Sequence, residues 1–174
     1  LLIPFLSPYA VNNMLINTVD IKYMYLFGGL LTIFTARIFG VLTDRVGGLK
    51  LYSVILFAAF APIFLFTNAG PTSFIGYVCL GAFFMSLVSG RMIPCMTMLS
   101  EVPTLEERGL FMGLLNSIRT LGSALMTFLG GLIITQGVDG KMVGFDTAGY
   151  ISMAIGIASI FLAVTIKSNT ETSN

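Results

Sequence analysis

The residues of this chain that could do chemistry are few and mostly basic. The sequence has nine Lys and Arg, eight Asp and Glu, two Cys and no His. Three arginines, Arg37, Arg91 and Arg119, fall inside long apolar runs, whereas the acids lie in the turns between the runs. An enzyme site within a membrane would need a nucleophile with a base, or a set of metal ligands. The sequence offers neither, so we predict no enzyme, no metal site and no cofactor.

The elements around these residues indicate a membrane protein. Of the 174 residues, 56% are hydrophobic and 10% are charged, and the mean hydropathy is +0.93. A net charge of +1 gives no basic surface for nucleic acid. Since about 20 apolar residues cross a bilayer, there is room for about six spans. We expect an all-α, integral membrane bundle over 1–167, with six transmembrane helices at roughly 1–16, 21–42, 49–67, 73–99, 109–135 and 147–166, then a polar, disordered tail at 168–174.

Charged turns set the expected orientation of the bundle. One turn runs over 40–50 and another over 101–109. Basic residues in short loops favour the cytoplasmic side of a membrane. On the side of these two turns and the C-terminus lie Arg45, Lys50, Arg108 and Lys167; on the other side lie Lys22 and Lys141. We therefore expect the charged turns and the C-terminus to be cytoplasmic.

Small residues predict a helix-packing face in the fifth run. Gly109, Gly113 and Ser117 follow one another at four-residue spacing, and Gly122 lies further along the same run. Small side chains on one helical face let two backbones approach closely in a membrane. We expect this face to pack against a neighbouring helix.

The first charged turn resembles a known signature. Gly40-x-Leu42-x-Asp44-Arg45-x-Gly47 is similar to the loop pattern of the major facilitator superfamily, Gly-x-x-x-Asp-Arg-x-Gly-Arg-Lys. The chain departs from that pattern at Gly48 and Leu49, where the pattern has basic residues. The stretches 89–94, 101–109 and 116–122 look like helices ten and eleven of the family's drug or sugar efflux branch.

This resemblance covers the whole chain as helices seven to twelve. It implies the C-terminal six-helix half of a secondary transporter in the inner (plasma) membrane, working by alternating access with a separate N-terminal six-helix half as partner. The activity it implies is proton-coupled efflux, by antiport, of a small organic solute. The chain starts in mid-run without Met, from which we expect an N-terminal truncation. A half-sized transporter that dimerises, and a non-transporting scaffold or sensor on the same fold, remain alternatives.

The charged residues suggest a gate. The three intramembrane arginines lie about 10 to 17 Å from the charged turns, at about 1.5 Å per helical residue. An arginine near the bilayer centre costs roughly 2.5–3.5 kcal/mol. We hypothesise that Asp44, Arg91, Glu101 and Arg108 form a network that ties the cytoplasmic helix ends together in one transport state. The loop signature adds Gly40, Arg45 and Gly47 to this gate. The alternative is that the arginines snorkel to the headgroups.

The resemblance also implies a substrate cavity. In the family the first and fourth helices of each half line the cavity, which here implies Tyr9, Asn12 and Asn13 with Met85 and Ser89. Amides could hydrogen-bond a solute, and Tyr or Met could pack on its apolar part. The alternative for Asn12 and Asn13 is that they satisfy the backbone broken beside Pro8.

Overall fold

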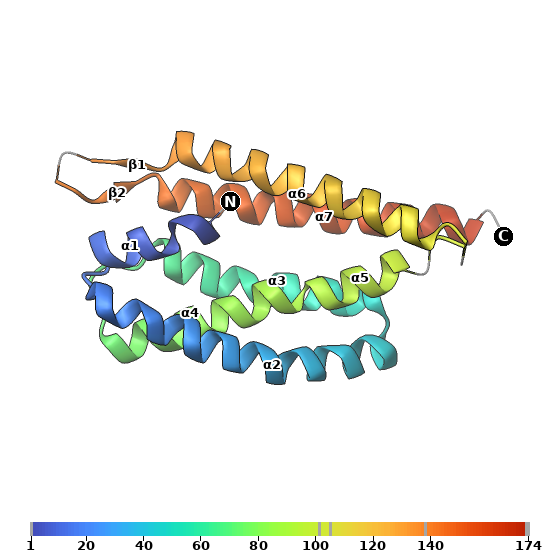
Figure 1. Ribbon diagram of the computed structural model, residues 1–174, viewed down its shortest axis with the longest axis horizontal. Coiled ribbons are helices and arrows are strands. Elements are labelled where there is room, and N and C mark those ends of the chain that lie inside the picture. The colour runs from blue at the N-terminus through green and yellow to red at the C-terminus, as the bar shows by residue number, and fades with distance from the viewer. Residues whose placement is uncertain (1, 101, 105, 138, 173–174) are drawn as a thin grey trace.

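The computed structural model describes residues 2–100, 102–104, 106–137 and 139–172. Long helices run side by side along one axis: α2 (Ile21–Val46), α3 (Gly48–Thr67), α4 (Phe74–Gly90), α5 (Met92–Ser100), α6 (Arg108–Ile133) and α7 (Phe145–Thr172) (Figure 1). Helices α2, α3, α4 and α5 pack together, α7 contacts α3, and α6 lies along α7. The α2–α3 turn and the α5–α6 link lie at the same end of this bundle (Figure 1).

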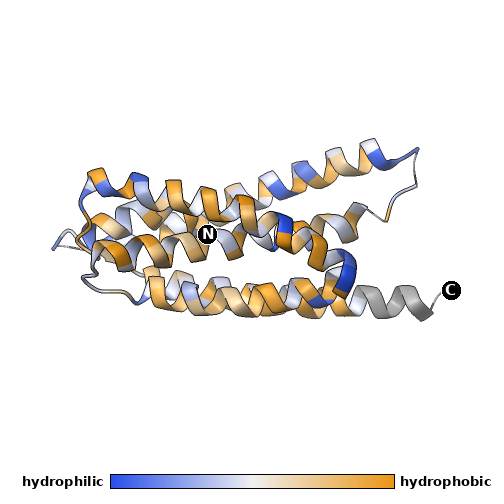
Figure 2. Ribbon diagram, turned by 90° about the horizontal axis from the view of Figure 1, so that it is seen from below, coloured by the Kyte–Doolittle hydropathy of each residue, from blue (hydrophilic) through white to orange (hydrophobic). Residues whose placement is uncertain are grey.

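The helices have the composition of membrane spans. Within the described residues, four segments are long and apolar enough to cross a bilayer: Thr18–Val46, Gly48–Thr67, Phe74–Ser100 and Phe145–Thr165. Figure 2 shows hydrophobic residues along most of the length of the helices, with hydrophilic residues at their ends and at a few positions between. Helix α6 has 26 residues but is not among these four segments. Six spans were expected from the sequence, so the prediction is confirmed for four helices by length and composition.

The first predicted span, 1–16, holds only short helical pieces within the described residues. These pieces are a 3-10 turn, η1 (Ile3–Phe5), and the seven-residue helix α1 (Leu6–Asn12). Seven helical residues cover only about 10 Å, a third of a hydrocarbon core of roughly 30 Å. A second 3-10 turn, η2 (Thr18–Asp20), leads into α2.

The charged turn after α2 is shorter than the sequence indicates. Residues 40–50 were expected to form a turn, but α2 continues through Asp44 and Arg45 to Val46. A single residue, Gly47, links α2 to α3 with φ 93° and ψ 141°. Glycine is the residue that adopts such a positive φ without strain from a Cβ. The motif therefore places its charges on the last helical turn and only its glycine in the link.

The fourth predicted helix, 73–99, corresponds to the candidate span Phe74–Ser100. It is interrupted at a single residue, because α4 ends at Gly90 and α5 begins at Met92. Pro94 has no backbone N–H, and its ring clashes with the carbonyl four residues earlier, which belongs to Gly90. This proline explains the break at Arg91.

Glycines on α2 and α4 bring these two helices together. A Cβ at Gly81 would overlap the buried Met24 side chain, and a Cβ at Gly90 would overlap the Phe39 ring. A Cβ at Gly28 would come within 3.2 Å of Met85. Side chains of each helix thus fill the space left by glycines of the other.

A small β-ribbon that the sequence did not predict joins α6 to α7. Strand β1 (Thr135–Gln136) pairs antiparallel with β2 (Met142–Val143). Gly140 and Gly144, with φ of 76° and 85°, turn the chain around it. Helix α7 then continues to Thr172. Residues 168–172, predicted as a disordered tail, are therefore helical.

Candidate functional site

A groove with both polar and apolar side chains lies along α6 and meets α5 at Met92. Its volume is about 780 Å³, within the range of roughly 300–1,000 Å³ that suits a small organic ligand. The residues that line it are Met92, Arg119, Thr120, Ser123, Ala124, Thr127 and Phe128. All but Met92 belong to α6.

The groove follows from the two faces of α6. Asn116, Thr120, Ser123 and Thr127 recur at spacings of four, three and four residues, which places them on one side of the helix. The other side carries large apolar residues that are exposed in the structure and suit contact with lipid: Leu114, Ile118, Leu121, Leu125, Leu129 and Leu132. The sequence reasoning missed Thr120, Ser123 and Thr127, although their helical spacing was a signal that could have found them.

Arg119 is the charged residue of the groove. Its Nη2 donates a hydrogen bond of 3.0 Å to Oδ1 of Asn116, and the Thr120 hydroxyl donates to the Asn116 carbonyl at 2.9 Å. Arg119 lies eleven residues after Arg108 and fourteen before Ile133 in α6, or about 17 Å and 21 Å from the two helix ends. It is therefore near the middle of α6, and none of the seven lining residues is acidic.

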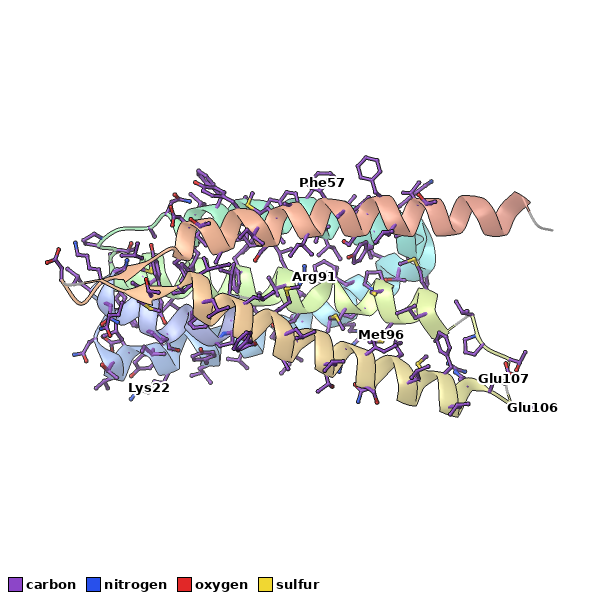
Figure 3. All side chains as sticks on the ribbon, turned by 90° about the horizontal axis from the view of Figure 1, so that it is seen from above. Lys22, Phe57, Arg91, Met96, Glu106 and Glu107 are labelled. Carbon is purple, nitrogen blue, oxygen red and sulfur yellow. The ribbon has the colours of Figure 1, made fainter. Side chains whose placement is uncertain are left out.

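Two predicted members of the charge network, Asp44 and Arg108, lie at the same end of the bundle. Asp44 and Arg45 lie on the last turn of α2, beside Gly47, and Arg108 begins α6. Figure 3 shows Glu106 and Glu107 at this end and Lys22 at the opposite end. Glu101 lies outside the described residues, and a Cβ at Gly40, within α2, would meet no atom within 4 Å.

Arg91 lies deeper than the other predicted members of the network. It is half-buried at the break between α4 and α5, and Figure 3 places it near the middle of the bundle's length. Ser100, the end of α5, lies nine residues further on, or about 14 Å along a helix. The coupling of Arg91 to Asp44 and Arg108 stays a prediction.

Two of the predicted cavity residues have their polar atoms engaged by backbone. Tyr9 is buried, and its hydroxyl donates to the carbonyl oxygens of Thr67 and Ala69 at 3.0 and 2.9 Å. Its ring stacks on Phe145 with centroids 4.1 Å apart. Burial, and then the negative charge of Asp146, raise the pKa of Tyr9, so the phenol remains a donor. Tyr9 thus fixes α1 to the end of α3.

Asn13 joins α1 to the β-ribbon. Its Nδ2 donates to the Met142 carbonyl at 2.9 Å, and the Met142 N–H donates to its Oδ1 at 2.8 Å. The alternative for Asn13 was that its side chain satisfies the backbone broken beside Pro8. Its backbone partner is instead Met142 on β2. Asn12, the last residue of α1, is half-buried.

Met85 and Ser89 sit on α4. Met85 is half-buried and packs against Gly28 of α2. Ser89 is exposed and lies one helical turn before Met92, where the groove begins. Of the five predicted cavity residues, Ser89 is therefore placed nearest along the chain to the groove.

The predicted packing face on α6 meets no helix in the described chain. A Cβ at Gly109, Gly113 or Gly122 would find no atom within 4 Å. Ser117 is exposed, and its hydroxyl donates to the Gly113 carbonyl at 3.1 Å. No helix of the described chain covers these residues, and their packing on a neighbouring helix stays a prediction.

A second groove, between α2 and α4, has a different character. Its volume is about 500 Å³, and its lining consists of Phe27, Leu31, Phe74, Ile75, Val78, Cys79, Ala82 and Phe83. These side chains offer a solute almost no hydrogen-bonding partner. The groove is suited to lipid chains rather than to a polar solute.

The long apolar helices and the charged residues at the bundle's ends indicate a multi-pass membrane protein, and the groove on α6 is a candidate site for a small molecule. The family model of the Major Facilitator Superfamily matches residues 1–174, and the chain belongs to this family of membrane transporters, which are not enzymes. The family expected from the sequence is thereby confirmed. Comparison with curated proteins and with solved structures gives no match.

Proposed function

We propose that this chain is the C-terminal half of a secondary transporter that exports a small organic solute by alternating access in exchange for protons. The observation that carries the proposal is the polar groove on α6, which has the volume and the hydrogen-bonding groups of a solute site. It occurs in a chain whose family transports small molecules across membranes.

The groove accounts for solute binding, and the rest of the bundle accounts for movement. The α2–α4 contact is tight because glycines receive Met24, Met85 and Phe39. Gly130 alone is buried among the described side chains of α6. Alternating access requires one bundle to rock against another around a shared site. A rigid α2–α4 core with a loosely covered α6 face fits that requirement, with the N-terminal half covering α6.

Proton coupling requires a titratable group, such as an acid or a His, that this chain does not offer in its apolar runs. The apolar runs of this chain carry no His and no interior acid. A proton-coupled cycle needs a group that titrates along the path. We therefore assign the coupling acid to the N-terminal half.

Flux measurements test the function. The full-length protein would be reconstituted in liposomes and challenged with a pH gradient and a panel of sugars, drugs and organic acids. We expect solute movement that a protonophore abolishes. A folded, monodisperse protein without flux for any member of the panel would favour a scaffold or sensor instead. The molecular mass of the purified assembly separates a twelve-helix monomer from a dimer of half-sized chains.

The charge network is tested in the same vesicles. We expect Asp44→Asn and Arg91→Ala to slow transport, because each removes a charge that biases the equilibrium between the two states of the carrier. Arg37→Gln is the matched control, since Arg37 lies exposed on α2. Rates for both variants equal to the control would contradict the network.

Orientation is tested by thiol labelling in cells. We propose that the end with Asp44 and Arg108 is cytoplasmic in the inner membrane, with the C-terminus on the same side, because the basic residues are more numerous there. In a background without Cys79 and Cys95, the variants Asp44→Cys and Arg108→Cys should resist an impermeant maleimide that labels Lys141→Cys. Equal labelling of all three positions would overturn this topology.

A further inference from the structure

We propose that the groove between α5 and α6 binds organic carboxylates with an apolar tail, and that Arg119 holds the carboxylate. As a substrate class this inference rests on the proposed transport function. As a binding site it stands on the groove itself, and it can be tested without a transport cycle.

The charge of the groove calls for an anion. Arg119 is exposed near the middle of α6, and none of the seven lining residues is acidic. The nearest acid before it in the chain is Glu107, which immediately precedes α6 and lies twelve residues earlier, or about 18 Å along a helix. At such a distance a carboxylate gives Arg119 no direct partner. An anionic ligand would supply the partner that the described part of the helix lacks.

Arg119 is also positioned to receive a carboxylate. An arginine has five N–H donors in a fixed, planar arrangement. One of them is used in the 3.0 Å hydrogen bond to Asn116, which restrains the guanidinium against the helix. The remaining donors are enough for a two-pronged hydrogen bond to a carboxylate, the strongest pairing that this side chain makes. Asn116 is therefore a positioning residue for Arg119.

The other lining residues of the groove indicate which groups the ligand carries besides its carboxylate. Thr120, Ser123 and Thr127 place hydroxyls along eight residues of α6 from Arg119, about 12 Å. Ala124, Phe128 and Met92 add apolar surface. A bare inorganic ion would leave that surface uncovered. A carboxylate carrying an apolar tail of similar length covers both kinds of surface.

Two sources could supply this chemistry, a soluble organic acid or a membrane lipid with an anionic headgroup. Both join a negative charge to an apolar chain. We commit to the soluble acid as the substrate, because the three hydroxyls match a solute that carries polar groups beyond its charge. A lipid competing for Arg119 is an outcome that the experiment distinguishes.

The test compares two probes of the same shape and different charge. The full-length protein in nanodiscs of zwitterionic lipid would be titrated with 4-phenylbutyrate and with its neutral amide, each radiolabelled. Charge-assisted hydrogen bonds are roughly twice as strong as neutral ones. We therefore expect the acid to bind more tightly than the amide by at least about tenfold.

Substitutions test whether the preference for the acid over the amide depends on Arg119. Arg119→Gln keeps hydrogen-bond donors but removes the charge, and should abolish the preference for the acid. Arg119→Lys should restore part of it, because it returns the charge without the planar fork. Arg37→Gln removes an arginine from α2 outside the groove and should behave as the natural protein does. Elution as a single monodisperse peak checks that each variant is folded.

Three results would overturn the proposal: equal binding of acid and amide by the natural protein, a preference that survives Arg119→Gln, or an equal loss in Arg37→Gln. Adding phosphatidylglycerol to the nanodiscs separates the two sources. If it weakens acid binding to the natural protein, a lipid headgroup shares the site; if it does not, the site is selective for the solute. If the protein binds the acid but shows no flux in vesicles, the anion site is supported and the transport function is contradicted. If the protein shows flux but no preference for the acid, the transport function is supported and the anion site is contradicted.

Discussion

Gly149→Ala should destabilise the bundle, because Gly149 is where α7 rests on α3. A Cβ at Gly149 would lie 2.7 Å from Cγ2, 2.8 Å from Oγ1 and 3.0 Å from Cβ of Thr67. Ordinary contact begins at 3.4 Å, so the two groups must separate by about 0.7 Å (3.4 − 2.7). Thr67 is 3% exposed and cannot simply turn away.

The hydrogen bonds of Thr67 explain why this residue resists movement. Its hydroxyl donates to the Ile63 carbonyl at 2.9 Å, and its own carbonyl accepts from Tyr9 at 3.0 Å. Threonine is also branched at Cβ, which restricts its rotamers in a helix. Displacing it disturbs the attachment of α1 as well as the α3–α7 contact.

The expected size follows from two opposing terms. Overpacking of this kind costs about 1–3 kcal/mol, and replacing a helical glycine by alanine returns about 0.5–1 kcal/mol. The net loss is about 0–2.5 kcal/mol, and its midpoint of about 1.25 kcal/mol lowers Tm by about 3–5 °C for a chain of this length. Thermal stability of the protein in detergent, followed by the loss of its size-exclusion peak after heating, measures this shift.

Two companion variants make the result decisive. Gly29→Ala on α2 is the control, since a Cβ there meets no atom within 4 Å and no fall in Tm is expected. In a Thr67→Ala background the two closest atoms are gone, so the effect of Gly149→Ala should shrink by at least about 0.5 kcal/mol. A Tm for Gly149→Ala equal to that of Gly29→Ala would refute the contact between α7 and Thr67.

Two further substitutions test the links at opposite ends of the bundle. Asn13→Ala removes both hydrogen bonds to Met142 and leaves its backbone groups unpaired, so we expect a loss of about 1–3 kcal/mol and faster amide exchange at the ribbon, with Asn12→Ala as the milder comparison. No change in amide exchange at Met142 would contradict the hydrogen bonds between Asn13 and Met142. Gly47→Ala forces a Cβ into a positive φ and should cost about 1–3 kcal/mol of stability. Gly40→Ala, within α2 where a Cβ has space, should not lower Tm, and similar Tm values for the two variants would contradict the role of Gly47 as the link between α2 and α3.

Hydropathy and turn residues were enough to predict most of the helices. The predicted ranges 49–67 and 109–135 compare with observed helices at Gly48–Thr67 and Arg108–Ile133. Long apolar runs bounded by glycine, proline and charge allow few other arrangements in a membrane. The position of Asp44 and Arg45 inside α2 was harder to predict, because a single glycine sufficed for the link.

The features that sequence reasoning missed depend on distant partners. The two-residue strands of the ribbon are fixed in part by Asn13, which is 129 residues away from Met142. Tyr9 and Asn13 looked like solute ligands because polar groups in an apolar run need partners. Their partners proved to be backbone atoms of α3, its following loop and β2, which no local pattern reveals.

The two grooves differ in the surroundings that suit them. The groove between α2 and α4 is apolar and lies beside the α2–α4 contact, where Met24 fills the space at Gly81. The groove on α6 carries hydroxyl groups and Arg119, and Gly109 and Gly113, earlier on the same helix, are open. A polar helix face exposed to hydrocarbon is unfavourable, since its hydroxyls and Arg119 would lose their hydrogen bonds with water. The hydroxyl face of α6 is therefore the side that must be covered by protein or by a water-filled path, and the leucine face is the side left for lipid.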